Sequence, residues 1–86
     1  MKILKTMTNV ELETQLQKCF FSITERQDIA VNINYDEVCI KFWGRSGEAV
    51  QTFNIKLPFS DEEYLFHTFE DFALFITAGV VRILVN

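Results

Sequence analysis

The sequence predicts a small α+β domain spanning residues 1–86, in which two helices pack on one face of an antiparallel sheet. Three observations indicate this class. Two stretches begin with helix-start signals and continue with apolar residues at helical spacing. Between them, residues 29–57 alternate between apolar and polar side chains, and turn-forming residues interrupt the alternation. The expected element order is (β)-α-β-β-β-α-β, where residues 2–6 form either a short first strand or an arm.

The first helix is expected to begin at Thr8 and to end near Ser22. Thr8 and Glu11 have the spacing of a capping box, in which each side chain bonds the other residue's backbone N–H. The apolar residues that follow fall on one narrow stripe, made of Leu12, Leu16, Cys19, Phe20 and Ile23. This pattern predicts an amphipathic helix that packs on a sheet.

A hairpin is expected next, because strict alternation begins at Ile29 and resumes at Val38. A two-residue loop at 36–37 pairs Tyr35 with Val38 and keeps the apolar side chains of both strands on one face. A four-residue loop leaves the same side chains on each face, since the side-chain period of a strand is two.

A third strand follows a second turn. Gly47 and then Glu48 fit a two-residue hairpin loop with glycine first, which pairs Phe42 with Phe53 and predicts a three-stranded meander. The opposite face of this sheet is polar and consists of Asn32, Asn34, Cys39, Lys41, Trp43, Thr52, Asn54 and Lys56. Trp43, beside Lys41, is the one large aromatic on that face and is a candidate partner-binding residue.

The second helix is expected from Ser60 to Ala78. Ser60 and Glu63 again have capping-box spacing, and Gly79 suits the residue that ends a helix. Its buried stripe is expected to contain Leu65, Phe69, Phe72, Ala73 and Ile76. The β-branched residues of 80–85 are expected to form a short last strand.

The opposite face of this second helix is acidic. No Lys or Arg occurs from residue 57 to residue 81, whereas the same region holds five acids: Asp61, Glu62, Glu63, Glu70 and Asp71. Glu70 and Asp71 would lie beyond the first turn of a helix that begins at Ser60, so the helix dipole would not account for them. The five acids are therefore the predicted partner-binding residues, together with Trp43.

Composition and charge exclude several classes of function. The net charge of −4 disfavours direct binding to nucleic acid or to anionic membranes. Two cysteines do not form a disulfide framework, and the N-terminus lacks the apolar segment of a signal peptide. The longest apolar run, 72–81, is about half the length of a membrane span. These features predict a cytoplasmic protein.

No catalytic, metal or cofactor motif is expected. Glu63, His67 and Asp71 would stack on one face of the expected helix. Known metal sites have more complete ligand sets, so these three residues alone do not predict a metal site. Cys19 lies on a buried stripe, and Cys39 has no evident histidine partner. The sequence has no glycine-rich phosphate loop. We therefore expect a protein without enzymatic activity, bound metal or cofactor.

Two functional hypotheses remain. In the first, the protein is a protein-binding module, and specifically a small acidic inhibitor of the type made by phages and mobile elements. Its acidic helix, 61–78, would mimic nucleic acid and dock on a basic surface of its partner. In the alternative, the protein is a structural homo-oligomer, such as a homodimer, that associates through surplus phenylalanine and an open strand edge. Nine phenylalanines are many for a domain of this size.

Overall fold

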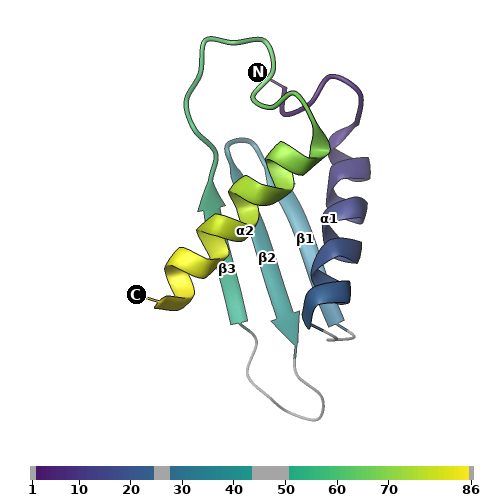
Figure 1. Cartoon of the computed structure of the whole chain (residues 1–86), viewed down its shortest axis with the longest axis vertical. Coiled ribbons are helices and arrows are strands. Elements are labelled where there is room, and N and C mark those ends of the chain that lie inside the picture. Colours follow the sequence, from purple (N-terminus) through teal and green to yellow (C-terminus); the bar gives the residue numbers. More distant parts are fainter. Residues whose placement is uncertain (1, 25–27, 44–50, 86) are drawn as a thin grey trace.

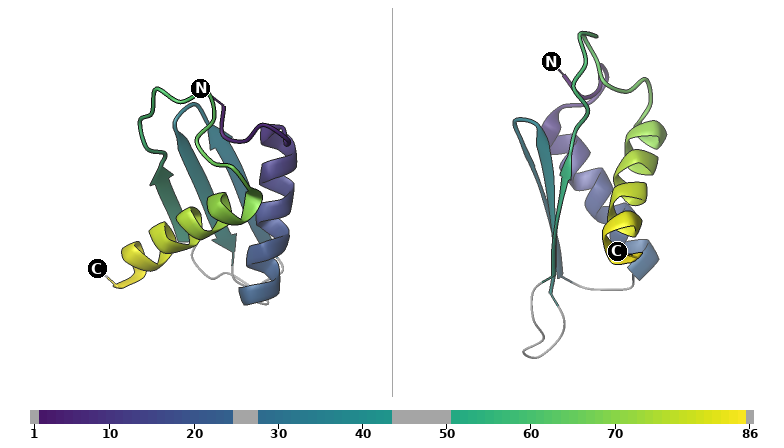
Figure 2. Two further views of the ribbon diagram at one scale, coloured as in Figure 1. Left: turned by 45° about the horizontal axis from the view of Figure 1, so that its top comes forward. Right: turned by 90° about the vertical axis from the view of Figure 1, so that its left-hand side faces the viewer.

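The fold is a three-stranded antiparallel sheet with both helices on one face (Figure 1). The computed structural model describes residues 2–24, 28–43 and 51–85. In chain order the elements are α1 (Asn9–Thr24), β1 (Asp28–Asn34), β2 (Glu37–Trp43), β3 (Gln51–Lys56) and α2 (Phe69–Val85). The sheet order is β1-β2-β3, and Figure 2 shows both helices on the same side of it. The predicted α+β class, helix order and meander are confirmed.

The strand register differs by two residues from the expected one. β1 and β2 are joined through residues 35–36, so Ile33 pairs with Val38, and Tyr35 lies in the turn, fully exposed. Ile40, and not Phe42, pairs with Phe53. A shift of two leaves every side chain on its expected face, so the inner face of the sheet remains apolar. The expected turn at 47–48 lies outside the described residues.

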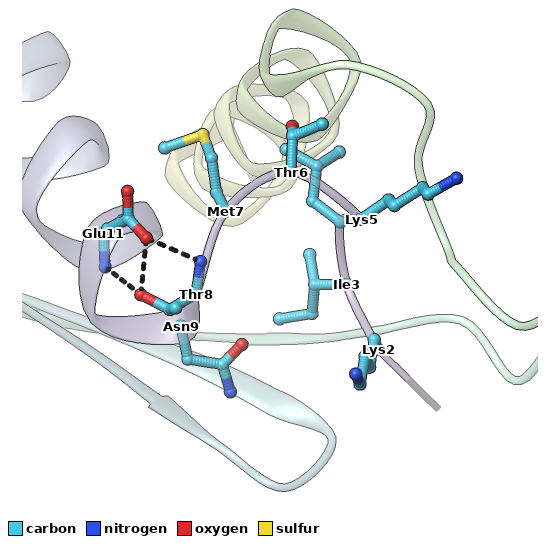
Figure 3. Close-up of a pocket in the computed structure, with 9 residues that line it drawn as sticks. Lys2, Ile3, Lys5, Thr6, Met7, Thr8, Asn9 and Glu11 are labelled. Atoms are coloured by element: carbon cyan, nitrogen blue, oxygen red, sulfur yellow. Dashed lines mark hydrogen bonds between the residues drawn. The ribbon is translucent and has the colours of Figure 1, made fainter.

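The first helix begins as predicted. The Thr8 N–H donates to Glu11 Oε1 at 3.1 Å, and the Glu11 N–H donates to Thr8 Oγ1 at 3.2 Å, which completes the capping box (Figure 3). Leu12, Leu16 and Phe20 of α1 are buried in the core. Phe20 meets the edge of the Phe42 ring on β2, with ring centroids 5.9 Å apart.

The second helix begins eight residues later than the predicted helix 61–78, at Phe69. Its cap is Thr68, whose Oγ1 accepts the Asp71 N–H at 3.2 Å. Ser60 instead accepts the Glu62 N–H at 3.0 Å in a local turn. The expected cap at Ser60 was therefore wrong. The reason is that the segment after Ser60 forms backbone hydrogen bonds with another part of the chain and not within a helix.

That part of the chain is the N-terminal arm. The Lys2 N–H donates to the Glu63 carbonyl at 3.1 Å, and the Leu65 N–H donates to the Lys2 carbonyl at 3.0 Å, as neighbouring parallel strands do. The Phe66 N–H donates to the Ile3 carbonyl at 3.0 Å. These bonds make an isolated parallel bridge between Lys2 and Tyr64 and keep residues 63–66 out of a helix. The arm itself is buried at Ile3 and Leu4, so the segment 2–6 is a packed element and not a loose arm.

The expected last strand, 80–85, was also wrong, because these residues continue α2. Phe72, Ile76 and Val80 recur every three or four residues and are buried against the sheet. Tertiary packing of this stripe overrides the strand preference of the β-branched residues. Gly79, expected to end the helix, lies inside it.

Candidate protein interface

The five predicted acidic site residues are all exposed, but they do not form one helix face. Residues 61–63 lie in the connection before α2, and Glu70 and Asp71 lie in the first turn of α2. Negative charge in a first turn is stabilised by the helix dipole. The dipole therefore accounts for Glu70 and Asp71, contrary to the expectation from the sequence.

Trp43 lies apart from these acids. It ends β2, opposite Asp28, on the face of the sheet that no described helix covers, and its side chain is 37% exposed. In Figure 1 the end of β2 and the connection before α2 are at opposite ends of the sheet. The structure therefore does not bring Trp43 together with the predicted acidic residues.

The three residues considered for a metal do not come together in a helix, because Glu63 and His67 precede α2. Among residues 2–24, 28–43 and 51–85 there is no cluster of three or more His, Cys, Asp or Glu side chains that could hold a metal ion. Cys19 and Cys39 are both half-buried free thiols, one on α1 and one on the outer face of β2.

A hollow of about 390 Å³ lies beside the N-terminal arm, between Lys2 and Glu11 (Figure 3). Its two lysines, Lys2 and Lys5, are exposed, and its one carboxylate, Glu11, is bonded to Thr8 in the capping box. Thr8 and Glu11, the two hydrogen-bonded side chains that line it, therefore serve the start of α1.

The two edges of the sheet differ. On β1, the Val31 N–H donates to Gln17 Oε1 at 3.3 Å and the Ile33 N–H donates to Glu13 Oε2 at 2.6 Å. Side chains of α1 thus occupy the donors that an added strand would need. The β1 edge is closed.

The β3 edge is open as far as the described residues go. The Leu57 N–H donates to the Asp36 carbonyl at 2.8 Å, so it points toward the β1–β2 turn. Backbone groups alternate in direction along a strand, so those of Thr52, Asn54 and Lys56 point away from β2. In the part of the chain that the structure describes, no further strand pairs with β3.

Helix α2 extends past this open edge. It crosses the sheet diagonally, and its C-terminal end projects beyond β3 (Figures 1 and 2). On its sheet-facing side the exposed fraction is 0% at Phe72 and Ile76, 7% at Val80 and 44% at Ile83. Ile83 continues this spacing near the end of the helix, and among the described residues no strand lies beyond β3.

The rest of this helix end is apolar as well. Val81, Leu84 and Val85 are 50%, 63% and 75% exposed, and Arg82 is the one charged residue of α2 after its first turn. A helix that is apolar on all sides is normally buried. We call this region the β3–α2 surface, defined by Thr52, Asn54 and Lys56 of β3 and by Val81, Ile83, Leu84 and Val85 of α2.

Sequence reasoning missed the α2 part of this surface because residues 80–85 were interpreted as a strand. The signal that could have found it was the continuation of the spacing Phe72, Ile76, Val80 into Ile83.

Comparison with known proteins adds no assignment, since no family model, curated protein or solved structure matches this chain. Of the helices described, none has the length and apolar character needed to cross a membrane.

Proposed function

We propose that this protein is a non-enzymatic protein-binding module and that its interface is the β3–α2 surface. The observation that carries the proposal is the exposure of Ile83, which continues the helical spacing of the buried residues Ile76 and Val80. It lies near the end of α2, the end that projects beyond β3. Contiguous exposed apolar residues on a small domain mark interaction sites. This apolar patch lies directly beside an open strand edge.

The two halves of the surface fit one mode of recognition. An extended segment that pairs with β3 would satisfy the outward backbone groups of Asn54 and Lys56. The same segment would lie beneath the projecting end of α2 and would cover Ile83. One partner segment could therefore form main-chain hydrogen bonds with β3 and bury apolar side chains of α2 at the same site.

A second candidate function is the acidic inhibitor, for which the exposure of all five predicted acids is the favourable observation. In this alternative, Asp61, Glu62 and Glu63, with Glu70 and Asp71, would contact a basic surface that normally receives nucleic acid. The charge would come from a connection and a helix start, and not from a single helix 61–78. Such binding would be weakened by salt.

Association measurements with two double variants distinguish these candidates. Light scattering and affinity capture from the source cell would be applied to the native chain, to Ile83→Lys with Leu84→Lys, and to Glu70→Lys with Asp71→Lys. We expect the first pair to abolish association and the second to leave it unchanged, with little effect of salt. Trp43→Ala is the control on the uncovered sheet face.

Each contrary result has a clear meaning. If the Glu70 and Asp71 reversal removes a partner that salt also releases, the acidic inhibitor is the correct function. If the native chain neither self-associates nor captures a stoichiometric partner, a protein-binding function is wrong.

A further inference from the structure

We propose that the partner of the β3–α2 surface is a second copy of this chain, with β3 paired antiparallel to β3 of the second copy. This inference rests on the proposed function and specifies its partner. The twofold axis is perpendicular to the sheet and lies midway between Ile55 of one copy and Ile55 of the other. The two three-stranded sheets then form one continuous sheet.

The backbone geometry supports this register. Residues 54 and 56 direct their N–H and carbonyl groups toward the free edge, as argued from the Leu57 hydrogen bond. With the axis at Ile55, Asn54 lies opposite Lys56 of the second copy, and the two residues can exchange both backbone hydrogen bonds. Pro58 has no N–H, so the pairing ends shortly beyond.

The side chains match in the same register. On the inner face, Ile55 meets Ile55 of the second copy, and Phe53 meets Leu57 of the second copy. All three residue types are buried and apolar in one chain, at 6%, 6% and 8% exposed. On the outer face, each Lys56 lies beside an asparagine and not beside another lysine, so no like charges are opposed.

The projecting helix supports the same arrangement. Rotation about an axis perpendicular to the sheet makes the two α2 helices antiparallel, because α2 runs along the sheet (Figure 2). The end of each helix extends over the strand that the second copy contributes. Ile83, which is 44% exposed in one chain, would then be covered by the second copy.

The closed β1 edge limits the assembly to two copies. Glu13 and Gln17 occupy the outward donors of Ile33 and Val31 in the middle of β1, so β3 cannot continue onto β1 of another chain. A chain with one open edge can pair only with the same edge of its partner. Such pairing is closed and produces a dimer, whereas two different open edges would produce a fibre.

The test uses a matched pair of charge variants on the full chain. Asn54→Glu would place a carboxylate opposite Lys56 of the second copy, and Asn54→Lys would place a like charge there, each twice per dimer. We expect the dissociation constant of the Asn54→Glu dimer to be roughly tenfold lower than that of the Asn54→Lys dimer, measured by analytical ultracentrifugation. The difference should shrink in high salt. The controls are Asn32→Glu and Asn32→Lys, in the same row of the sheet but on closed β1, which should leave the dimer unchanged.

Amide exchange provides an independent readout. In the dimer the N–H groups of Asn54 and Lys56 should exchange slowly, and on dilution they should exchange faster by an order of magnitude or more. The Val31 and Ile33 N–H groups, already bonded to α1, should not change on dilution.

Three results would overturn the inference. They are a chain that stays monomeric at high micromolar concentration, a dimer whose Asn54 and Lys56 amides exchange freely, and a dimer that responds equally to both Asn54 variants. A monomer that captures a different protein through Ile83 and Leu84 would overturn the second copy as partner and leave the protein-binding function standing.

Discussion

Gly79 of α2 lies directly against Ile55 of β3. A Cβ atom added to Gly79 would be 2.9 Å from both Cδ1 and Cγ2 of Ile55, closer than carbon atoms pack without rearrangement. The glycine therefore allows α2 to approach the sheet at this point. The same strand residue lies at the centre of the proposed dimer, so this close approach also sets how far α2 projects beyond β3.

The contact predicts that Gly79→Ala destabilises the protein. On helix propensity alone the change should stabilise by about 1 kcal/mol, but forcing extra volume into a packed site costs about 1–3 kcal/mol. We expect a net loss of about 1 kcal/mol in urea unfolding, and a smaller loss in the Ile55→Val background, where Cδ1 is absent. Ala78→Gly, at the exposed neighbouring position, is the control that measures the effect of helix propensity without the packing against Ile55. If Gly79→Ala instead increased the free energy of unfolding, the Ile55 side chain would have to move aside at little energetic cost.

Phe72→Ala should be among the most damaging changes in the chain. Phe72 is fully buried and contacts the rings of Phe66 and Phe69, with centroids 5.6 Å and 6.3 Å away. Truncating a buried phenylalanine costs about 3–5 kcal/mol. Leu74→Ala, two residues along but 69% exposed, should cost less than about 1 kcal/mol. Equal losses in thermal or urea melts would contradict the helix orientation described here.

Thr68→Ala should weaken the start of α2. Its Oγ1 accepts the Asp71 N–H, and loss of such a cap costs about 1 kcal/mol. Ser60→Ala should cost distinctly less, because Ser60 makes a local turn and does not cap a helix. Denaturant melts of the two variants decide between the two helix starts. A larger loss at Ser60 would favour the longer helix expected from the sequence.

Replacing both Glu13 and Gln17 by alanine should open the β1 edge. The N–H groups of Val31 and Ile33 would lose their side-chain acceptors and exchange faster with solvent. A chain with two open edges can assemble without limit, so light scattering should detect species larger than a dimer. Gln15→Ala with Lys18→Ala, at exposed positions of α1, is the matched control. An unchanged size distribution would mean that these bonds do not protect the edge.

Tyr64 should ionise at higher pH than an ordinary tyrosine. Partial burial raises its pKa above 10.0, and the neighbouring Glu63 carboxylate raises it further through charge repulsion and a hydrogen bond. The unfolded chain therefore ionises first, so the contribution to stability is complete below pH 10 and is lost as pH rises through the folded pKa. Absorbance titration in a Tyr35→Phe background isolates Tyr64. Glu63→Gln should lower its pKa, and no change would exclude Glu63 as a cause.

The sequence by itself determined the class of fold and most of its core. The Thr8–Glu11 capping box and the alternation around Ile40 are local signals, and no other part of the chain competes with them. Even a register error of two residues left every strand side chain on the correct face, because the strand period is two. The exposure of acids 61–63 and 70–71 also followed from their sequence context.

Only the tertiary structure decided where α2 begins and ends. Ser60 and Thr68 are both acceptable caps, and the choice between them depended on Lys2 and Ile3. These two residues are distant in the sequence, and their hydrogen bonds keep 63–66 out of a helix. Residues 80–85 continue the helix against their local strand preference, and of these only Val80 is buried against the rest of the protein. The projection of the helix end that carries Ile83 depends on the angle at which α2 crosses β3, and Gly79 allows the close approach to Ile55 at that crossing. Such an angle arises from packing between distant segments, so no local pattern in the sequence encodes it.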